Sequence, residues 1–299
     1  MPEPTVVNAT PIQTPIFRLL PGVFQSQPVS NGTSLCLLPL YTYAKTLIFF
    51  TVAGTAATRA QIVAQLTQVR VVLSGREIWI GSGAQLVALG AFYSQNDVNA
   101  TEVGFLSLAF LRQWMAGADQ RLASVLGTMD QSALQIEFSW GAAITITTNA
   151  AFAARLAEGE NTGVATRVMR VSPNIGSLGI SIYPDLPLPR SGETLLALHL
   201  FPPVVANLTN LAYIADDMRI IDAPATALNR MYLETDPPRT PQGANGMVSI
   251  DFTALLASPQ SGVPMAAIAN HVLELTFATA APGSFPILCE FAGVIPAGR

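Results

Sequence analysis

The second half of the chain repeats the first half at a nearly constant spacing. Identical residues recur in the same order 142 positions later, with Leu66, Thr67, Ile78, Leu86, Gly104, Ser107 and Phe110 recurring as Leu208, Thr209, Ile220, Leu228, Gly246, Ser249 and Phe252. Farther on, the run Leu134, Ile136 and Phe138 resembles Leu273, Leu275 and Phe277 at a spacing of 139, which a short loop deletion would explain. This period is far longer than that of solenoids or propellers. The chain is therefore predicted to contain two tandem domains of similar fold.

The composition indicates a surface that is unusually poor in charge. Charged residues make up 11% of the 299 residues and hydrophobic residues 50%, whereas about 25% charged residues is typical. The most apolar stretch, Leu35 to Ala53, is interrupted by Pro39 and Lys45, so it lacks the roughly 18 uninterrupted apolar residues of a membrane span. The start, Met1-Pro2-Glu3-Pro4, lacks the features of a signal peptide. We expect large subunit contacts to cover the apolar exterior.

Charge and cysteine content exclude further classes of protein. The net charge is −4 and Lys45 is the single lysine, so no basic patch is available to neutralise phosphates, and direct nucleic-acid binding is not expected. Cys36 and Cys289 lie far apart and match neither a zinc-site spacing nor a dense disulfide framework. We expect two buried thiols, and a bridge between them stays open.

Short runs of alternating apolar residues, ended by turn residues, predict a β-rich fold. Val69–Leu73 and Arg76–Ile80 flank Ser74-Gly75, which predicts a hairpin, and Asp216-Asp217 occupies the same repeat position in the second half. Further strands are predicted at Thr46–Val52, Phe105–Phe110, Leu134–Trp140, Ile144–Thr148, Leu195–Phe201, Val248–Phe252, Leu273–Phe277 and Pro286–Phe291.

Each unit is also predicted to carry a helix between two of its later strands. In the first unit apolar residues recur at helical spacing, at Leu111, Trp114, Met115, Ala118, Leu122, Val125 and Leu126. The second unit has a shorter candidate at Pro264–Asn270. The proline-rich residues 1–30 are predicted to form an extended arm, followed by a first domain at 31–158 and a second at 159–299. The leading fold is all-β, with two tandem eight-stranded jelly rolls.

Few residues suggest catalytic or metal chemistry. His199 lies within an apolar strand and His271 at a strand start, so a packed or hydrogen-bonded histidine is favoured over a catalytic base at both positions. One histidine per domain cannot build the metal cluster of a cupin. Asp216 and Asp217 are weak candidates for metal binding, although a plain turn is favoured. Gly81-Ser82-Gly83 is interpreted as a loop rather than a phosphate-binding site.

These features together resemble one family, the double jelly-roll major capsid proteins of tailless icosahedral viruses. The similarity is greatest to the capsid proteins of small bacteriophages that enclose a membrane, such as the corticoviruses. It rests on Gln68–Arg76, on the order of Phe105–Phe110, a helix and Leu134–Phe138, and on Asp185–Pro189 before Leu195–Phe201. It covers about residues 40 to 290.

The resemblance implies a structural role without a catalytic site or a cofactor. Such proteins form homotrimers of pseudo-hexagonal outline, and the trimers tile an icosahedral shell over an internal membrane. Implied partners are further copies of the chain, a vertex protein and the membrane or its proteins; the implied location is the virion, after synthesis in the host cytoplasm. Some relatives hold metal ions between subunits, so structural calcium is an expectation here. The scarcity of lysine and arginine weakens electrostatic contact with lipid headgroups.

Two other functions remain as alternatives. A two-domain binding module, such as a spike or a carbohydrate-binding protein, would present exposed aromatic residues on loops, whereas Trp79, Trp114 and Trp140 lie within predicted strands or the helix. An enzyme of the two-jelly-roll amidase kind would need paired carboxylates in a cleft. The candidates for such a pair are Asp185, Glu193, Glu234 and Asp236.

Overall fold

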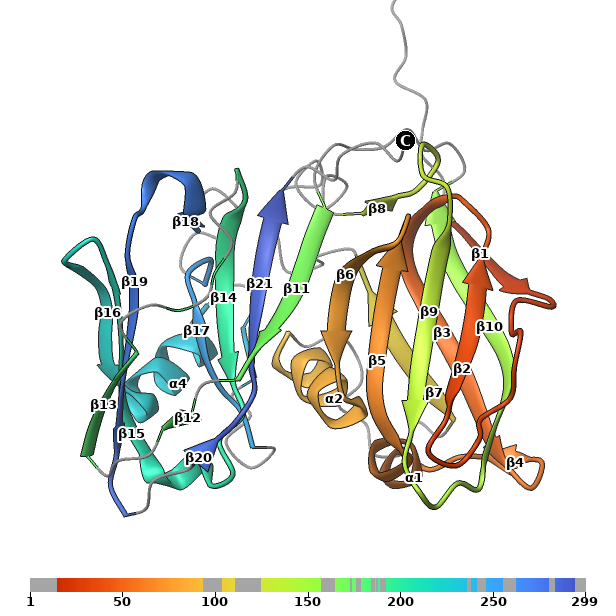
Figure 1. Ribbon diagram of the computed structural model, residues 1–299, viewed down its shortest axis with the longest axis horizontal. Coiled ribbons are helices and arrows are strands. Elements are labelled where there is room, and N and C mark those ends of the chain that lie inside the picture. The colour runs from red at the N-terminus through yellow and green to blue at the C-terminus, as the bar shows by residue number, and fades with distance from the viewer. Residues whose placement is uncertain are drawn as a thin grey trace, which may run out of the picture.

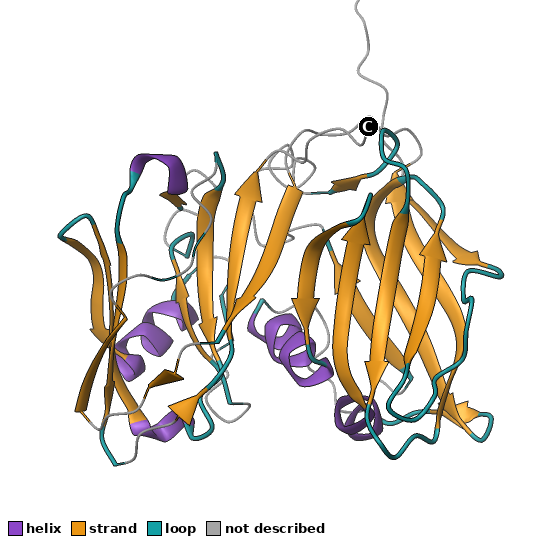
Figure 2. Cartoon of the chain, in the orientation of Figure 1, coloured by secondary structure: helices purple, strands orange, loops and turns teal. Residues whose placement is uncertain are grey.

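The chain folds into two β-sandwiches that lie side by side, as the computed structural model shows (Figure 1). Strands dominate both units, and one helix lies between the two units (Figure 2). The structure describes residues 15–93, 104–110, 125–156, 165–172, 174–175, 179–183, 186, 188, 192–235, 238–240, 246–254, 262–279 and 283–293.

The first sandwich, here called roll 1, consists of two antiparallel sheets. One sheet has the order β1 (Pro15–Leu20), β10 (Ile146–Leu156) and β3 (Thr42–Val52), with β4 (Thr55–Ala56), β7 (Phe105–Ala109) and β8 (Leu126–Gly127) also paired to β3. The other has the order β2 (Thr33–Leu38), β9 (Leu134–Trp140), β5 (Leu66–Leu73) and β6 (Arg76–Gly81). Their inner faces form one core, in which Ile48, Val71 and Phe138 are fully buried.

The second sandwich, roll 2, repeats the order of the eight main strands of roll 1. One sheet has the order β11 (Ala165–Val171), β21 (Ile287–Gly293), β14 (Thr194–Leu200) and β17 (Val248–Asp251), with β18 (Val263–Pro264) also paired to β14. The other has the order β13 (Gly179–Tyr183), β19 (His271–Phe277), β15 (Leu208–Ala215) and β16 (Met218–Pro224). A short pair joins β12 (Asn174–Ile175) and β20 (Gly283–Ser284). The predicted two tandem jelly rolls are confirmed.

The strand register corrects one detail of the predicted repeat. In roll 1 Val71 pairs with Ile136, and at the equivalent position of roll 2 Tyr213 pairs with Leu273. The structural spacing between β9 and β19 is therefore 137 (273 − 136), not 139. A shift of two residues keeps every side chain on the same face of a strand, so the apolar pattern alone could not distinguish the two spacings.

Both predicted hairpin turns are confirmed by their backbone angles. Ser74 and Gly75 have φ of 48° and 79°, and Asp216 and Asp217 have φ of 43° and 66°. Positive φ at both central residues is the type I′ geometry that suits the twist of two-residue hairpins. The same turn type at the same repeat position supports a duplication of one unit.

The helices differ from the prediction. The candidate beginning at Leu111 lies outside the described residues up to position 124, and Leu126 belongs to β8. The candidate Pro264–Asn270 is only the 3-10 turn η4 (Met265–Ala267), because Ile268 returns to an extended backbone. A second 3-10 turn, η1 (Val205–Asn207), precedes β15.

Among the described residues the structure contains three α-helices that the apolar pattern did not reveal. They are α1 (Arg59–Gln65), α2 (Gly83–Phe92) and α4 (Ala225–Leu233). Ser82 accepts a hydrogen bond from the Gln85 backbone while the Gln85 side chain accepts one from the Ser82 backbone, which forms a capping box. Gly81-Ser82-Gly83 is therefore a helix start and not a plain loop.

Part of the predicted N-terminal arm belongs to the sheet of roll 1. Pro15–Leu20 forms β1, which pairs with Ala151–Leu156 of β10 and so belongs to the sheet of roll 1. Phe24 also bridges to Cys36. Strand pairing satisfies the backbone groups of a proline-containing segment when it lies at a sheet edge, as β1 does. Residues 1–14 lie outside the described residues, as do residues 157–164 around the predicted boundary between the two domains.

Candidate functional site

The contact between the two rolls is built on helix α2. This helix follows β6 of roll 1 and lies between the two sandwiches (Figure 1). Leu86 packs into the core of roll 1, whereas Leu89, Phe92 and Tyr93 pack into the core of roll 2. A helix that is apolar on all sides is typically buried on all sides. Helix α2 is thus shared by both cores and fastens one roll to the other.

Aromatic side chains fill the roll 2 side of this contact. The Phe92 ring lies 5.3 Å from the ring of Tyr232 and 5.7 Å from that of His199, both nearly perpendicular to it. It also lies 4.9 Å from the ring of Tyr93. Edge-to-face pairs of this kind add to the stabilisation from burial alone.

Behind these rings lies a buried polar cluster. The Tyr93 hydroxyl donates to Glu290 Oε2 at 3.0 Å and lies 3.3 Å from His199 Nε2. His199 Nδ1 lies 2.8 Å from Ser249 Oγ, and Nε2 lies 3.6 Å from Glu290 Oε1. His199 and Glu290 are fully buried. Both ring nitrogens of His199 lie within hydrogen-bond distance of protein hydroxyl groups. The predicted hydrogen-bonded histidine is confirmed.

A buried ion pair, Arg239 with Asp251, lies next to the Tyr93 ring of this cluster. Arg239 Nε lies 3.1 Å from Asp251 Oδ2, and the guanidinium lies over the Tyr93 ring at 5.5 Å. Asp251 Oδ1 accepts from the Thr253 backbone and hydroxyl at 2.9 and 2.6 Å. Such extra hydrogen bonds offset the cost of burying two charges.

Tyr232 of α4 connects this ion pair to the histidine cluster. Its hydroxyl donates to the Ser249 backbone oxygen at 2.8 Å and accepts from the Asp251 backbone nitrogen at 2.9 Å. Burial, and secondarily the Asp251 charge, raises the pKa of Tyr232 above its ordinary value. The phenol therefore stays neutral and acts as a fixed hydrogen-bonding group.

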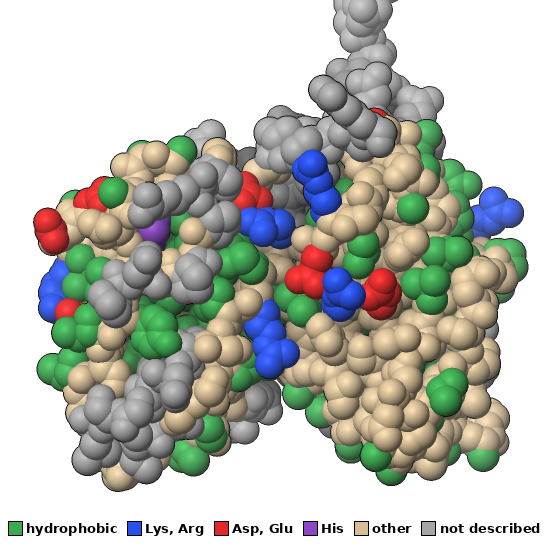
Figure 3. Space-filling view, viewed as in Figure 1, with side chains coloured by type: hydrophobic (Ala, Val, Ile, Leu, Met, Phe, Trp, Pro, Cys, Tyr) green, Lys and Arg blue, Asp and Glu red, His purple; other side chains and the backbone are tan. Residues whose placement is uncertain are grey.

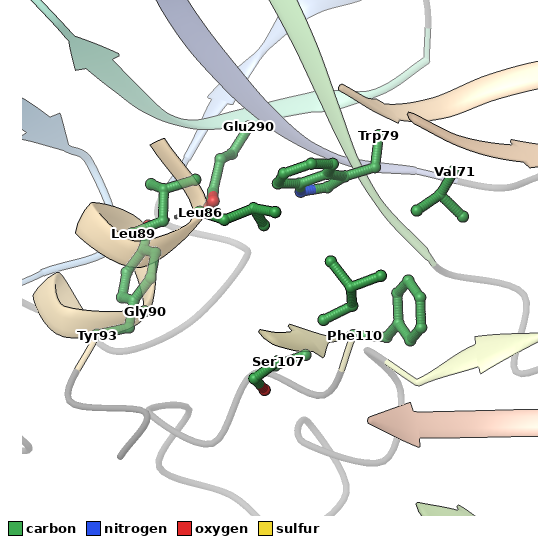
Figure 4. Close-up of a pocket in the computed structure, with 11 residues that line it drawn as sticks. Val71, Trp79, Leu86, Leu89, Gly90, Tyr93, Ser107, Phe110 and Glu290 are labelled. Carbon is green, nitrogen blue, oxygen red and sulfur yellow. Dashed lines mark hydrogen bonds between the residues drawn. The ribbon is translucent and has the colours of Figure 1, made fainter. Parts of the chain in front are cut away.

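A small pocket lies at the edge of this contact (Figure 4). Trp79 of β6, Leu86 and Leu89 of α2, Phe110 and Glu290 contribute to its lining. Its volume is about 40 Å³, whereas small-molecule sites are usually about 300 Å³ or larger. A few waters would fill it.

The structure does not assemble a metal site from Asp216 and Asp217. The Asp216 carboxylate accepts from the backbone nitrogens of Ala269 and Asn270 at 2.8 to 3.1 Å, so it serves the turn. Calcium usually takes six to eight oxygen ligands. Within the described part of the chain, no three His, Cys, Asp or Glu residues group together as ligands. Structural calcium stays a prediction.

The remaining candidate residues have structural partners. His271 Nδ1 lies 2.6 Å from the Tyr213 hydroxyl. Glu193 pairs with Arg167, and Glu234 pairs with Arg230, while Asp185 and Asp236 lie outside the described residues. Both cysteines are free and buried, and they belong to different cores. No carboxylate pair of the amidase kind is formed by Glu193 and Glu234.

The tryptophans do not form a sugar-binding platform in the described residues. Trp140 is buried and donates through Nε1 to Ser34 Oγ at 2.8 Å. Trp79 packs against both cores, and Trp114 lies outside the described residues. No described helix is long and apolar enough to span a membrane.

The sequence reasoning missed the groups at the roll contact. The Ser82 and Gln85 spacing of a capping box could have located α2. The placement of Tyr93, Arg239 and Glu290 side by side depends on tertiary packing, and no local pattern marks it.

Known capsid proteins share this architecture. The major capsid protein P2 of bacteriophage PM2 matches with a TM-score of 0.77 at 18% identity, over 94% of this chain and 98% of that one. The major capsid protein of Sulfolobus turreted icosahedral virus matches with a TM-score of 0.64 at 11% identity, over 95% and 98%. VP54 of PBCV-1 matches with a TM-score of 0.63 at 9% identity, over 96% of each chain. These similarities show the double jelly-roll fold.

Comparison at the level of sequence families identifies the chain more closely. None of the curated protein sequences matches it. The model of the viral coat protein P2 N-terminal domain matches residues 26–155, and that of the C-terminal domain matches residues 166–295. Together the two matches span both rolls in their natural order. The chain belongs to the viral coat protein P2 family and is a viral major capsid protein.

Proposed function

We propose that the chain associates into homotrimers of pseudo-hexagonal outline, and that these trimers tile an icosahedral shell over an internal membrane. The observation that carries the proposal is the duplicated roll with its roll-to-roll contact, since three copies supply six similar rolls. The visible surface supports it, because uncharged and apolar side chains cover much of it and charges are sparse (Figure 3). Such a surface suits contacts between copies.

The proposal also covers the synthesis of the subunit and its partners in the virus particle. The subunit acts without a catalytic step, is made in the host cytoplasm and meets a vertex protein within the shell. The net charge of −4 disfavours direct contact with nucleic acid. Contact with the membrane would then run through other proteins or through uncharged polar residues.

Electron microscopy of the purified protein and of virus particles tests the proposal. Negative-stain images are expected to show hexagonal outlines that join into sheets or shells. Particles are expected to contain lipid, which extraction and chromatography would detect. Images of isolated bilobed monomers at every concentration would contradict the trimer, and particles without lipid would contradict the membrane.

A further inference from the structure

Three polar side chains from the two rolls meet inside an otherwise apolar contact. Tyr93 ends helix α2 of roll 1, whereas His199 lies on β14 and Glu290 on β21 of roll 2. Their exposed fractions are 5%, 0% and 1%, so bulk water cannot replace the hydrogen bonds that they make with one another. We call these three residues the contact cluster.

The hydrogen bonds of the contact cluster have a fixed direction. A hydroxyl group has one proton, and the Tyr93 hydroxyl donates its proton to Glu290 Oε2 at 3.0 Å. The same hydroxyl can therefore only accept from His199 Nε2, which lies 3.3 Å away, so Nε2 carries a proton and donates it. The one hydroxyl that roll 1 contributes thus fits a donor and an acceptor of roll 2 at the same time.

The internal repeat shows that the jelly roll itself does not need these polar groups. Leu47 of β3 takes the place of His199, because each pairs with the repeated serine of the neighbouring strand. Ala154 of β10 takes the place of Glu290, because each pairs with the residue two positions earlier on β3 or β14. A sheet of the same fold therefore forms with leucine and alanine at these positions. The polar groups belong to the contact between the rolls.

The energetics of burial separate two roles that such a cluster could have. Replacing a buried polar network with apolar residues of similar volume is often neutral or stabilising, because burying charged groups costs much of what their attraction returns. Apolar burial, however, is non-directional, whereas a hydrogen bond requires a donor–acceptor distance of about 3 Å and a nearly straight angle. The cluster is therefore better suited to select one arrangement of the rolls than to stabilise it.

We propose that the contact cluster fixes the orientation of roll 2 relative to roll 1, and that this is its role rather than added stability. Leu89 and Phe92 hold the rolls together because both are buried in the core of roll 2. The Tyr93 hydroxyl then admits only the orientation in which His199 and Glu290 are both within reach. The proposal concerns a contact within one chain and does not depend on the proposed trimer.

Apolar substitution in the full-length chain tests the stability side of the proposal. The apolar variant combines Tyr93→Phe, His199→Leu and Glu290→Leu, so that no buried polar group of the contact cluster is left without its partner. We expect its equilibrium constant for unfolding in urea to be unchanged or lower than that of the wild-type chain. An apolar variant that is much less stable than the wild-type chain would overturn the proposal.

Pulsed electron paramagnetic resonance tests the orientation side. Spin labels at Leu37→Cys of β2 and Ile182→Cys of β13 lie at exposed positions of the two rolls, and the native thiols are buried. Labelled chains are diluted with unlabelled chains, so that each measured distance lies within one chain. The wild-type contact should give one narrow distance distribution. Tyr93→Phe alone, and the apolar variant, should each give a broader or displaced distribution.

Tyr213→Phe is the matched control. Tyr213 is also a buried tyrosine, but its hydroxyl lies 2.6 Å from His271 Nδ1 within roll 2. Its loss should lower the stability of roll 2 and leave the distance between the rolls unchanged. A wild-type distance distribution in Tyr93→Phe or in the apolar variant would overturn the proposal, because apolar packing would then orient the rolls. A monomeric wild-type chain would overturn the proposed trimer and leave this proposal standing.

Discussion

Replacing Phe92 with alanine should weaken roll 2 although Phe92 precedes that roll in the chain. Its side chain is buried in the core of roll 2, and it contacts three rings, those of Tyr93, His199 and Tyr232. Removing a buried phenylalanine costs about 3 to 5 kcal/mol, of which each aromatic contact accounts for about 0.5 to 1.5 kcal/mol. We expect a loss within that range.

Two spectroscopic probes separate the rolls in this experiment. Trp140 is buried in the core of roll 1 alone, so its fluorescence follows roll 1 once Trp79, which packs against both cores, and Trp114 are replaced with phenylalanine in all variants. Far-ultraviolet circular dichroism follows the strands of both rolls. In urea, Phe92→Ala should lose dichroism before the fluorescence changes. The control Phe138→Ala removes an equally buried ring from the core of roll 1, and its fluorescence should change first. All variants are compared at one protein concentration, because association adds to apparent stability.

The order of the dichroism and fluorescence transitions shows whether α2 stabilises both rolls. If Phe92→Ala lost less than about 1 kcal/mol, the ring would not be a buried part of the shared core. If its fluorescence changed first, as expected for Phe138→Ala, α2 would belong energetically to roll 1 alone. Either result would refute the reasoning that α2 fastens the two rolls.

Three further substitutions or reactions follow from local geometry. Gly104→Ala should lower the thermal stability of the protein more than Gly246→Ala does. Both glycines have positive φ, which costs alanine about 1 to 2 kcal/mol, but only at Gly104 would the new methyl group also meet the Phe49 ring. Equal losses of stability in the two variants would contradict this reasoning. Ser82→Ala removes the α2 cap and should cost about 1 kcal/mol in urea unfolding, and an unchanged midpoint would contradict it. Burial raises the pKa of the Cys36 thiol to about 12, so the native protein should resist thiol labelling at pH 8 and react only when unfolded. Because the folded state holds this proton and the unfolded state releases it near pH 9, stability should fall as pH rises from 9 to 12; rapid native labelling would exclude the buried thiol.

The duplicated architecture could be predicted because it leaves marks along the sequence. Gly104 and Gly246 recur since both adopt positive φ, which favours glycine, and the turns at Ser74 and Asp216 recur since two-residue hairpins require special residues. Strand positions followed from alternation, which the burial pattern of β9 and β19 repeats residue by residue.

The helices and the roll contact could not be predicted from the same patterns. Helix α2 is apolar on both sides because it lies between two cores, so it lacks the one-sided periodicity that marks a surface helix. Only the Ser82 and Gln85 spacing marks its start. Phe92 and Tyr93 belong to the core of roll 2, yet nothing in the local sequence shows which roll they enter.

The arm and the β19 spacing show two further limits. Prolines in the first thirty residues suggested an arm, but Pro15 opens β1 because an edge strand tolerates a missing backbone donor. The two-residue error in the β19 spacing survived because strand faces repeat every two residues. The extent of β1 and the spacing of β19 both follow from hydrogen-bonded pairing between strands, and the sequence does not show which strands pair.

The molar mass of the purified chain in solution tests the central claim most directly. Light scattering coupled to size exclusion should give about 95 kDa, three times the 31.6 kDa of the chain. A species that stays at 31.6 kDa over the whole concentration range would contradict the account, because the exposed apolar side chains Phe17 and Leu19 of β1 would then have no partner.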